Sequence, residues 1–152
     1  GHQHVHQLPG LRGIVLDMLA HVQPQPAVRN TSLAPATGFG FKRWVLTHTG
    51  GRALARELAR RHIARNPALL GVHDFRPRDY RLLVQQWLGS VPSEGALLFC
   101  HPGMATPDGP ADPIAASRER ELAYLGSDAF PEDLARAKVR LGHAWKLAPQ
   151  YG

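Results

Sequence analysis

The sequence predicts an α/β fold in which helices alternate with strands of a parallel sheet, either open or closed into a (β/α) barrel. Short apolar runs at Leu69–His73 and Ala96–Cys100 have the length and composition of buried strands. Around them lie helical patterns of about 10–15 residues, and such units form parallel sheets through right-handed crossovers. With 152 residues and 43% hydrophobic content, the chain suits a single domain spanning residues 1–152.

Five segments have the periodicity of amphipathic helices. We expect helices over 11–22, 53–65, from Pro77 to the turn at Gly89, over 115–125 and over 130–138. The residues predicted to face inward in the first three are Ile14, Val15, Met18 and Leu19; Leu54, Leu58 and Ile63; and Tyr80, Leu83, Val84 and Trp87.

Four strand candidates are visible, at 27–29, 69–73, 96–100 and 139–147. A closed parallel barrel of this kind needs about eight strands. The first strongly predicted element is a helix, and the histidine-rich segment before it has no strand ahead of it. We therefore expect the chain to form the second half of a larger β/α fold.

Polar side chains follow three predicted strands, at the end where parallel β/α folds collect their chemistry. His101 follows the strand at 96–100, Asp74 follows the strand at 69–73, and Arg29 ends the strand at 27–29. Pro102 biases His101 toward an extended backbone, and Gly103 permits a sharp turn. His101 is therefore a candidate general acid, general base or ligand. The alternative is a structural histidine bonded to a loop carbonyl.

Asp74 allows two interpretations, and the helix at 115–125 allows one from its residues alone. Asp74 could orient an imidazole or contact a substrate, or it could cap the helix that begins near Pro77. Arg118 and Glu121 belong to an alternating run of charges that is typical of a solvated helix face with intrahelical ion pairs.

Three alternating histidines, His2, His4 and His6, open the chain. In an extended segment their imidazoles project from the same side, and imidazole is a common ligand of zinc and similar ions. The segment therefore predicts a partial site for a divalent metal, with a tag remnant as the alternative. Because Cys100 is the single cysteine, such a metal must use histidine and carboxylate ligands.

Composition argues against several other functions. The surplus of positive charge lies largely on one predicted helix face, so we expect no nucleic-acid binding despite a net charge of +6. No apolar run approaches the roughly 18–20 residues of a membrane helix, and we expect no signal peptide. One cysteine suits a reducing compartment, which predicts a cytoplasmic location. Phosphate-loop, dinucleotide and serine-nucleophile motifs are absent.

Three motifs follow one another along the chain: His2-Gln-His4-Val-His6-Gln-Leu-Pro, then Phe-Cys-His101-Pro-Gly, then Arg118-x-x-Glu121-Leu. Together they resemble the YdjC-like carbohydrate deacetylase family, including its hopanoid-biosynthesis-associated branch and the chitooligosaccharide deacetylases. The runs at 71–75 and 112–125 are in the style of the same family, so the resemblance covers nearly the whole chain.

The resemblance implies part of a distorted (β/α) barrel that removes acetyl groups from N-acetylated sugars with a divalent metal, Mg²⁺ or Zn²⁺. Family members hold the metal with an aspartate of an Asp-Asp-Phe-Gly motif, a mid-chain histidine and the first histidine of the His-x-His-x-His run. Only the last has a counterpart here, at His2. The resemblance thus implies the C-terminal portion of a family member that holds its metal weakly.

The resemblance also implies roles for the other candidates. His101 would be the general acid or a polar stabiliser, Arg29 would orient a carboxylate, and Arg118 with Glu121 would form a rim or a structural ion pair. Substrate-binding or supporting positions are implied for His4, His6, Arg29, Asp74, Arg118 and Glu121.

Two functions remain open from the sequence. The first is a metal-dependent carbohydrate deacetylase, incomplete in this chain and linked to hopanoid or chitooligosaccharide metabolism. The second is a non-catalytic half-barrel that dimerises or binds a complementing N-terminal half. It follows from the open edges and apolar faces of half a parallel sheet.

Overall fold

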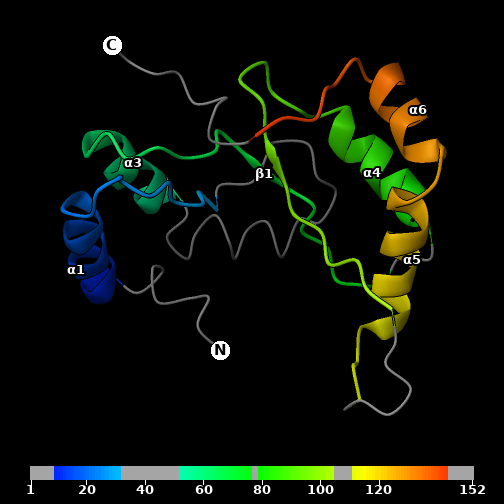
Figure 1. Cartoon of the computed structure of the whole chain (residues 1–152), viewed down its shortest axis with the longest axis horizontal. Helices are drawn as coiled ribbons and strands as arrows, with labels where there is room; N and C mark the ends of the chain where they lie inside the picture. Colours follow the sequence, from blue (N-terminus) through cyan, green and yellow to red (C-terminus); the bar gives the residue numbers. More distant parts are fainter. Residues whose placement is uncertain (1–8, 32–51, 77–78, 105–110, 144–152) are drawn as a thin grey trace.

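The computed structural model describes residues 9–31, 52–76, 79–104 and 111–143 (Figure 1). Within them lie five helices and two short parallel strands, so the predicted mixed α/β class is confirmed, while the described residues do not show a barrel. The elements are α1 (Pro9–Ala20), α3 (Arg52–Arg60), β1 (Leu69–Leu70), α4 (Tyr80–Leu88), β2 (Leu97–Leu98), α5 (Ala115–Leu125) and α6 (Ala129–Arg136). No helix in this part of the chain is long and apolar enough to cross a membrane.

The two strands pair in parallel, with Leu69 opposite Leu97 and Leu70 opposite Leu98. Because α4 lies between them in the chain, β1, α4 and β2 form one β/α unit of the predicted kind. The strands are shorter than the five-residue runs that predicted them. Gly71 ends the ladder because its φ of +89° turns the backbone away from strand geometry.

The larger hydrophobic core lies where α4, α5 and α6 pack against one another and against the strands, on one side of β1 in Figure 1. The predicted inner face of α4 is confirmed, since Tyr80, Leu83, Val84 and Trp87 are all buried. The helix begins later than predicted. Its N-cap is Asp79, whose carboxylate accepts a hydrogen bond from the Leu82 amide at 3.0 Å.

A smaller core joins α1 to α3 on the other side of β1. The predicted inward residues of α3 are confirmed, because Leu54 and Leu58 are buried together with Ile63. The helix ends at Arg60 instead of Arg65. His62 adopts a left-handed φ of 53°, and the Ile63 amide then bonds the Leu58 carbonyl at 3.0 Å, which closes the helix end.

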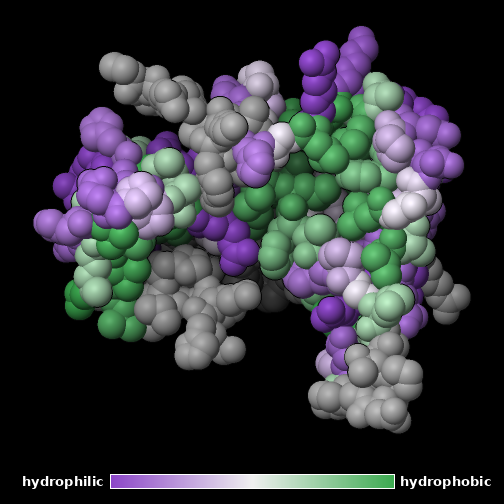
Figure 2. Space-filling model, in the orientation of Figure 1, coloured by the Kyte–Doolittle hydropathy of each residue, from purple (hydrophilic) through white to green (hydrophobic). Residues whose placement is uncertain are grey.

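The predicted inner face of α1 is wrong in part. Ile14 and Met18 are 59% and 66% exposed, whereas Leu16 is buried against α3 and Leu19 packs beside it. Apolar residues lie on two faces of this helix, so periodicity alone does not select the buried one. The exposed apolar residues, which we name the α1 apolar stripe, are Leu11, Ile14 and Met18 of α1 and Val22 just beyond its end, and they give hydrophobic surface over α1 in Figure 2.

At two further positions where a strand was predicted, the described residues form no strand. The segment around Val28 forms a single parallel bridge with Arg65 in place of a strand. The described part of the 139–147 candidate, residues 139–143, contains no strand. Beside the Val28 bridge, the Asn66 side chain accepts from the Asn30 amide at 2.8 Å and donates to the Asn30 carbonyl at 3.0 Å. These bonds fix the segment that carries Arg29.

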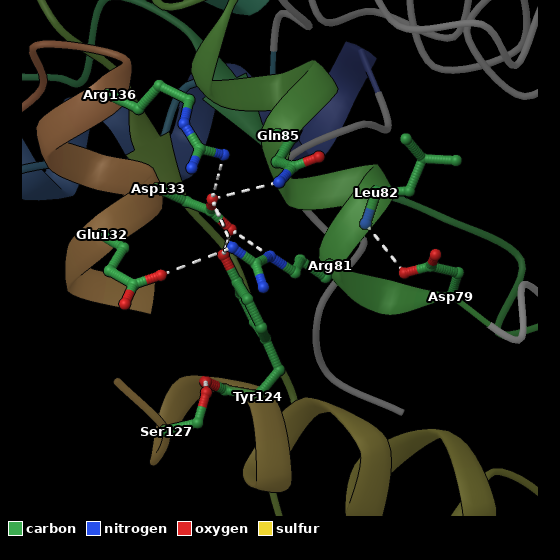
Figure 3. Close-up of polar contacts among 9 residues, drawn as sticks. All are labelled: Asp79, Arg81, Leu82, Gln85, Tyr124, Ser127, Glu132, Asp133 and Arg136. Atoms are coloured by element: carbon green, nitrogen blue, oxygen red, sulfur yellow. Dashed lines mark hydrogen bonds and ion pairs between the residues drawn. The ribbon is translucent and has the colours of Figure 1, made fainter. Parts of the chain in front are cut away.

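A buried carboxylate ties α4, α5 and α6 together (Figure 3). Asp133 of α6 accepts two hydrogen bonds from Arg81, at 2.8 and 3.0 Å, and one each from Gln85 and Tyr124 at 3.0 Å. The Arg81 guanidinium is the main cause that lowers the pKa of Asp133 to about 2. The three helices are therefore locked in one arrangement, and this arrangement sets where the residues of α5 lie.

Candidate functional site

The candidate site lies at the C-terminal ends of the two strands. His73 is the third residue after β1, and His101 is the third residue after β2. Because the strands are parallel and in register, both residues leave the sheet at the same edge. The carboxylate of Glu121, on α5, lies between them and bonds to both segments.

The His73 imidazole is buried and both of its nitrogens are engaged. Nε2 lies 3.0 Å from the Oε1 atom of Glu121. The Phe75 amide donates to Nδ1 at 3.2 Å, so Nδ1 carries a lone pair and Nε2 carries the proton that is donated to Glu121. This network assigns a neutral imidazole beside an ionised carboxylate.

Glu121 is fully buried, so the prediction of a solvated helix face is wrong at this residue. Its other oxygen, Oε2, accepts from the backbone amide of His101 at 2.5 Å. Ser117, Glu121 and Tyr124 form the buried face of α5, on which Glu121 bonds to the segments that follow both strands. The alternating charges in the sequence of α5 do not predict that this face is buried.

The His101 ring contacts two aromatic side chains. The Phe99 ring is 4.3 Å away and the Phe75 ring 5.1 Å away, both edge-on. The Nδ1 atom is buried and has no hydrogen-bond partner in the described part of the chain. Burial is the largest cause that lowers the pKa of His101, and the charge of Glu121 opposes it. The imidazole is therefore mainly neutral at pH 7.

Two arginines add positive charge around His101, and both help to lower its pKa. The Arg29 guanidinium lies over the Phe99 ring, 4.9 Å from the centroid. Arg118 pairs with Asp112 at 3.6 Å, so its ion-pair partner is not Glu121. The Arg118 guanidinium also packs against Gly103, where a Cβ atom would lie 2.5 Å from it.

Asp74 does not cap α4, so that interpretation is wrong. Its carboxylate accepts from the Arg76 amide at 3.1 Å, and Asp79 supplies the cap instead. The next residue, Phe75, has a left-handed φ of 64°, which is unusual for an aromatic residue and marks local strain. Sequence reasoning missed Phe75 because nothing in local sequence predicts this conformation. For His73, by contrast, its position at the end of a predicted strand was enough to predict that it lies at the site.

The histidines His2, His4 and His6 lie outside the described residues. Within the described ranges, no group of three His, Cys, Asp or Glu side chains is arranged to hold a metal ion. The nitrogens of His73 and the oxygens of Glu121 are already hydrogen-bonded to protein groups. The described residues alone therefore do not fit a metal.

Comparison with known proteins adds one positive finding. Neither the curated proteins nor the solved structures that were searched contain a match to this chain. A family model, described as YdjC-like protein, matches residues 1–136. The match covers most of the 152 residues and includes the histidine-rich segment, both strands and Glu121. The chain belongs to the YdjC-like family.

Proposed function

We propose that this protein serves in the hydrolysis of acetamido groups on N-acetylated sugars, as a carbohydrate deacetylase. Membership of the YdjC-like family supports this proposal. The structural observation that carries it is the His101 imidazole, which lies at the strand ends and whose buried Nδ1 atom has no hydrogen-bond partner among the described residues. The neighbouring imidazole of His73 has both nitrogens engaged and is not available for proton transfer.

In this proposal His101 acts on the group that changes charge during hydrolysis. Water adds to the acetamide carbonyl, the C–N bond breaks, and the products are acetate and a free amine that takes up a proton. A mainly neutral His101 is suited to take a proton from the attacking water and pass it to the leaving amine, or to donate a hydrogen bond to the developing charge. Phe75 and Phe99 pack edge-on against its ring, and a hydrogen bond is electrostatically stronger beside apolar groups than in water.

Acetate release from N-acetylated chitooligosaccharides, with Mg²⁺ or Zn²⁺ present, tests this role. We expect His101→Gln to lower kcat by about 100-fold or more, the usual contribution of a general acid or base. His143 is exposed and is distant in sequence from His101, so His143→Gln is the matched control. Equal rates in the two variants would remove His101 from the proposed mechanism.

For the metal that the family implies, we propose His2 as a ligand, with His4 and His6 beside it facing the substrate. Only one of the family's metal ligands has a counterpart here, so the expected affinity is weak. Isothermal titration with Zn²⁺ should give weak binding that His2→Ala reduces further. Tight binding that His2→Ala leaves unchanged would contradict this assignment.

A second candidate function is a non-catalytic half-barrel that pairs with another copy or with a complementing half. The α1 apolar stripe favours it, because Ile14 and Met18 leave large apolar side chains exposed. Size-exclusion chromatography with light scattering decides the oligomeric state. A stable monomer for the wild type, with no change in Ile14→Lys, would count against self-association through the stripe.

A further inference from the structure

We infer that Glu121 is a positioning residue that holds His101 from two directions, through the His101 backbone and through His73. The consequence for catalysis rests on the proposed function, whereas the arrangement itself rests on the hydrogen bonds alone. Glu121 would then contact neither the substrate nor the metal. Its carboxylate would act only by placing the imidazole that does.

The first direction is the backbone of the segment after β2. Glu121 Oε2 accepts from the His101 amide at 2.5 Å, and a hydrogen bond to an ionised acceptor is about twice as strong as a neutral one. The Glu121 side chain is fully buried. Since α5 is itself fixed to α4 and α6 through Asp133, this bond ties the backbone of His101 to a rigid part of the fold.

The second direction reaches the ring of His101. Glu121 Oε1 fixes the proton of His73 on Nε2, so the unprotonated Nδ1 accepts from the Phe75 amide at 3.2 Å. That bond supports the left-handed backbone of Phe75, whose ring then packs edge-on against His101 at 5.1 Å. The carboxylate thus controls one of the two aromatic walls of the His101 ring.

Glu121 also sets the electrostatic environment of His101. The charged or titratable groups that act on this imidazole come from three elements: Arg29 beside the Val28 bridge, His73 after β1, and Arg118 with Glu121 on α5. Among these groups Glu121 alone raises the pKa of His101, and the other three lower it. A purely structural residue at position 121 would not have this effect.

Glu121→Gln tests the inference, because the amide keeps the shape and removes the charge. The two donors bond to different oxygens of Glu121, and in the amide one of these positions is a donor NH₂ group, so the two acceptor positions are not both kept. The matched control is Glu119→Gln, an exposed glutamate on the same helix. The measurement is ¹⁵N NMR of the histidine side chains across pH in the full chain, with His73→Gln and His101→Gln variants for assignment.

In the wild type we expect His73 to be the Nε2-protonated neutral tautomer. In Glu121→Gln we expect a lower pKa for His101 and an altered His73 signal, with neither change in Glu119→Gln. On the proposed substrate, kcat should fall about 100-fold with a smaller change in KM, as expected for a misplaced catalytic group. Glu121→Asp keeps the negative charge, so it should raise the pKa of His101 again relative to Glu121→Gln. Because its side chain is shorter, it should not restore the full kcat.

Two results would overturn the inference. One is a wild-type His73 protonated on Nδ1, a result that stands even when Glu121→Gln fails to fold. The other is an unchanged His101 titration in a folded Glu121→Gln. Failure of the proposed function has a different signature. In that case no variant releases acetate, while the NMR differences between Glu121→Gln and Glu119→Gln remain and support the positioning role.

Discussion

Arg81 and Asp133 form a bidentate ion pair that joins the first turn of α4 to the middle of α6 (Figure 3). The Arg81 side chain is 41% exposed, whereas that of Asp133 is only 1% exposed. A buried carboxylate that loses its partners is strongly destabilising, because its desolvation is no longer offset. The pair therefore holds α4 against α6, with Arg81 partly at the surface and Asp133 in the interior.

We predict that Asp133→Asn lowers the free energy of unfolding at pH 7 more than Asp128→Asn does. Asp128 stands just before α6 and makes no capping hydrogen bond, so it serves as the matched control. The pKa of Asp133 is lowered to about 2 from an ordinary value of 3.8. Its stabilising contribution is thus complete above pH 4 and is lost as the pH falls through 2. Denaturant unfolding from pH 7 to pH 2 should show the deficit of Asp133→Asn shrinking with acid. A constant deficit would contradict the ionic origin.

We predict that Asn66→Ala destabilises the protein by about 2–4 kcal/mol, since buried backbone groups that lose their partners cost about 1–3 kcal/mol each. Asn66 is fully buried and bonds to the Asn30 backbone and to the Ala68 carbonyl. Urea unfolding measures the loss, and hydrogen exchange at the Asn30 amide should accelerate. Gln86→Ala, at an exposed position of α4, should change stability by no more than about 0.5 kcal/mol. Equal effects in the two variants would refute the role of Asn66.

The sequence was sufficient to predict which edge of the sheet carries the candidate site. Parallel strands end at a common edge, and the structure accordingly brings the Arg29 guanidinium over Phe99, two residues before His101. The buried stripe of α4 was also predictable, because its apolar residues occupy a single face. Both predictions rest on local pattern and on a general rule of β/α folds.

Other features depend on partners far apart in the chain. Glu121 is buried because His73, 48 residues earlier, supplies its hydrogen-bond donor, and a run of alternating charges contains no sign of this. The face of α1 that is buried was not predictable either, since Leu16 and Ile14 are equally apolar and only contact with α3 separates them. Local periodicity cannot decide between two apolar faces.

We predict that Gly71→Ala destabilises the protein by about 2–5 kcal/mol, from left-handed strain and overpacking together. Gly71 has a φ of +89°, and a Cβ atom there would overlap the carbonyl oxygen of Phe99. The control is Gly13→Ala in α1, where nothing lies within 4 Å of the added atom. That substitution should stabilise the protein by about 0.5–1 kcal/mol, because alanine is the better helix former. Thermal unfolding of both variants measures the contrast, and a neutral Gly71→Ala would mean that β1 and β2 separate at this point.

We predict that His101 makes the protein less stable in mild acid. Burial lowers the pKa of His101 in the folded state below its ordinary value of 6.5, while the unfolded chain takes up its proton near 6.5. Between these two pKa values the unfolded state binds more protons, so the free energy of unfolding decreases as the pH falls. His101→Gln removes this component. Urea unfolding at pH 7.5 and pH 5 should therefore show that acidification lowers the free energy of unfolding more in the wild type than in the variant. His143→Gln, at an exposed position, should retain the wild-type loss. Parallel behaviour of all three proteins would show that the His101 imidazole is protonated as readily in the folded state as in the unfolded one.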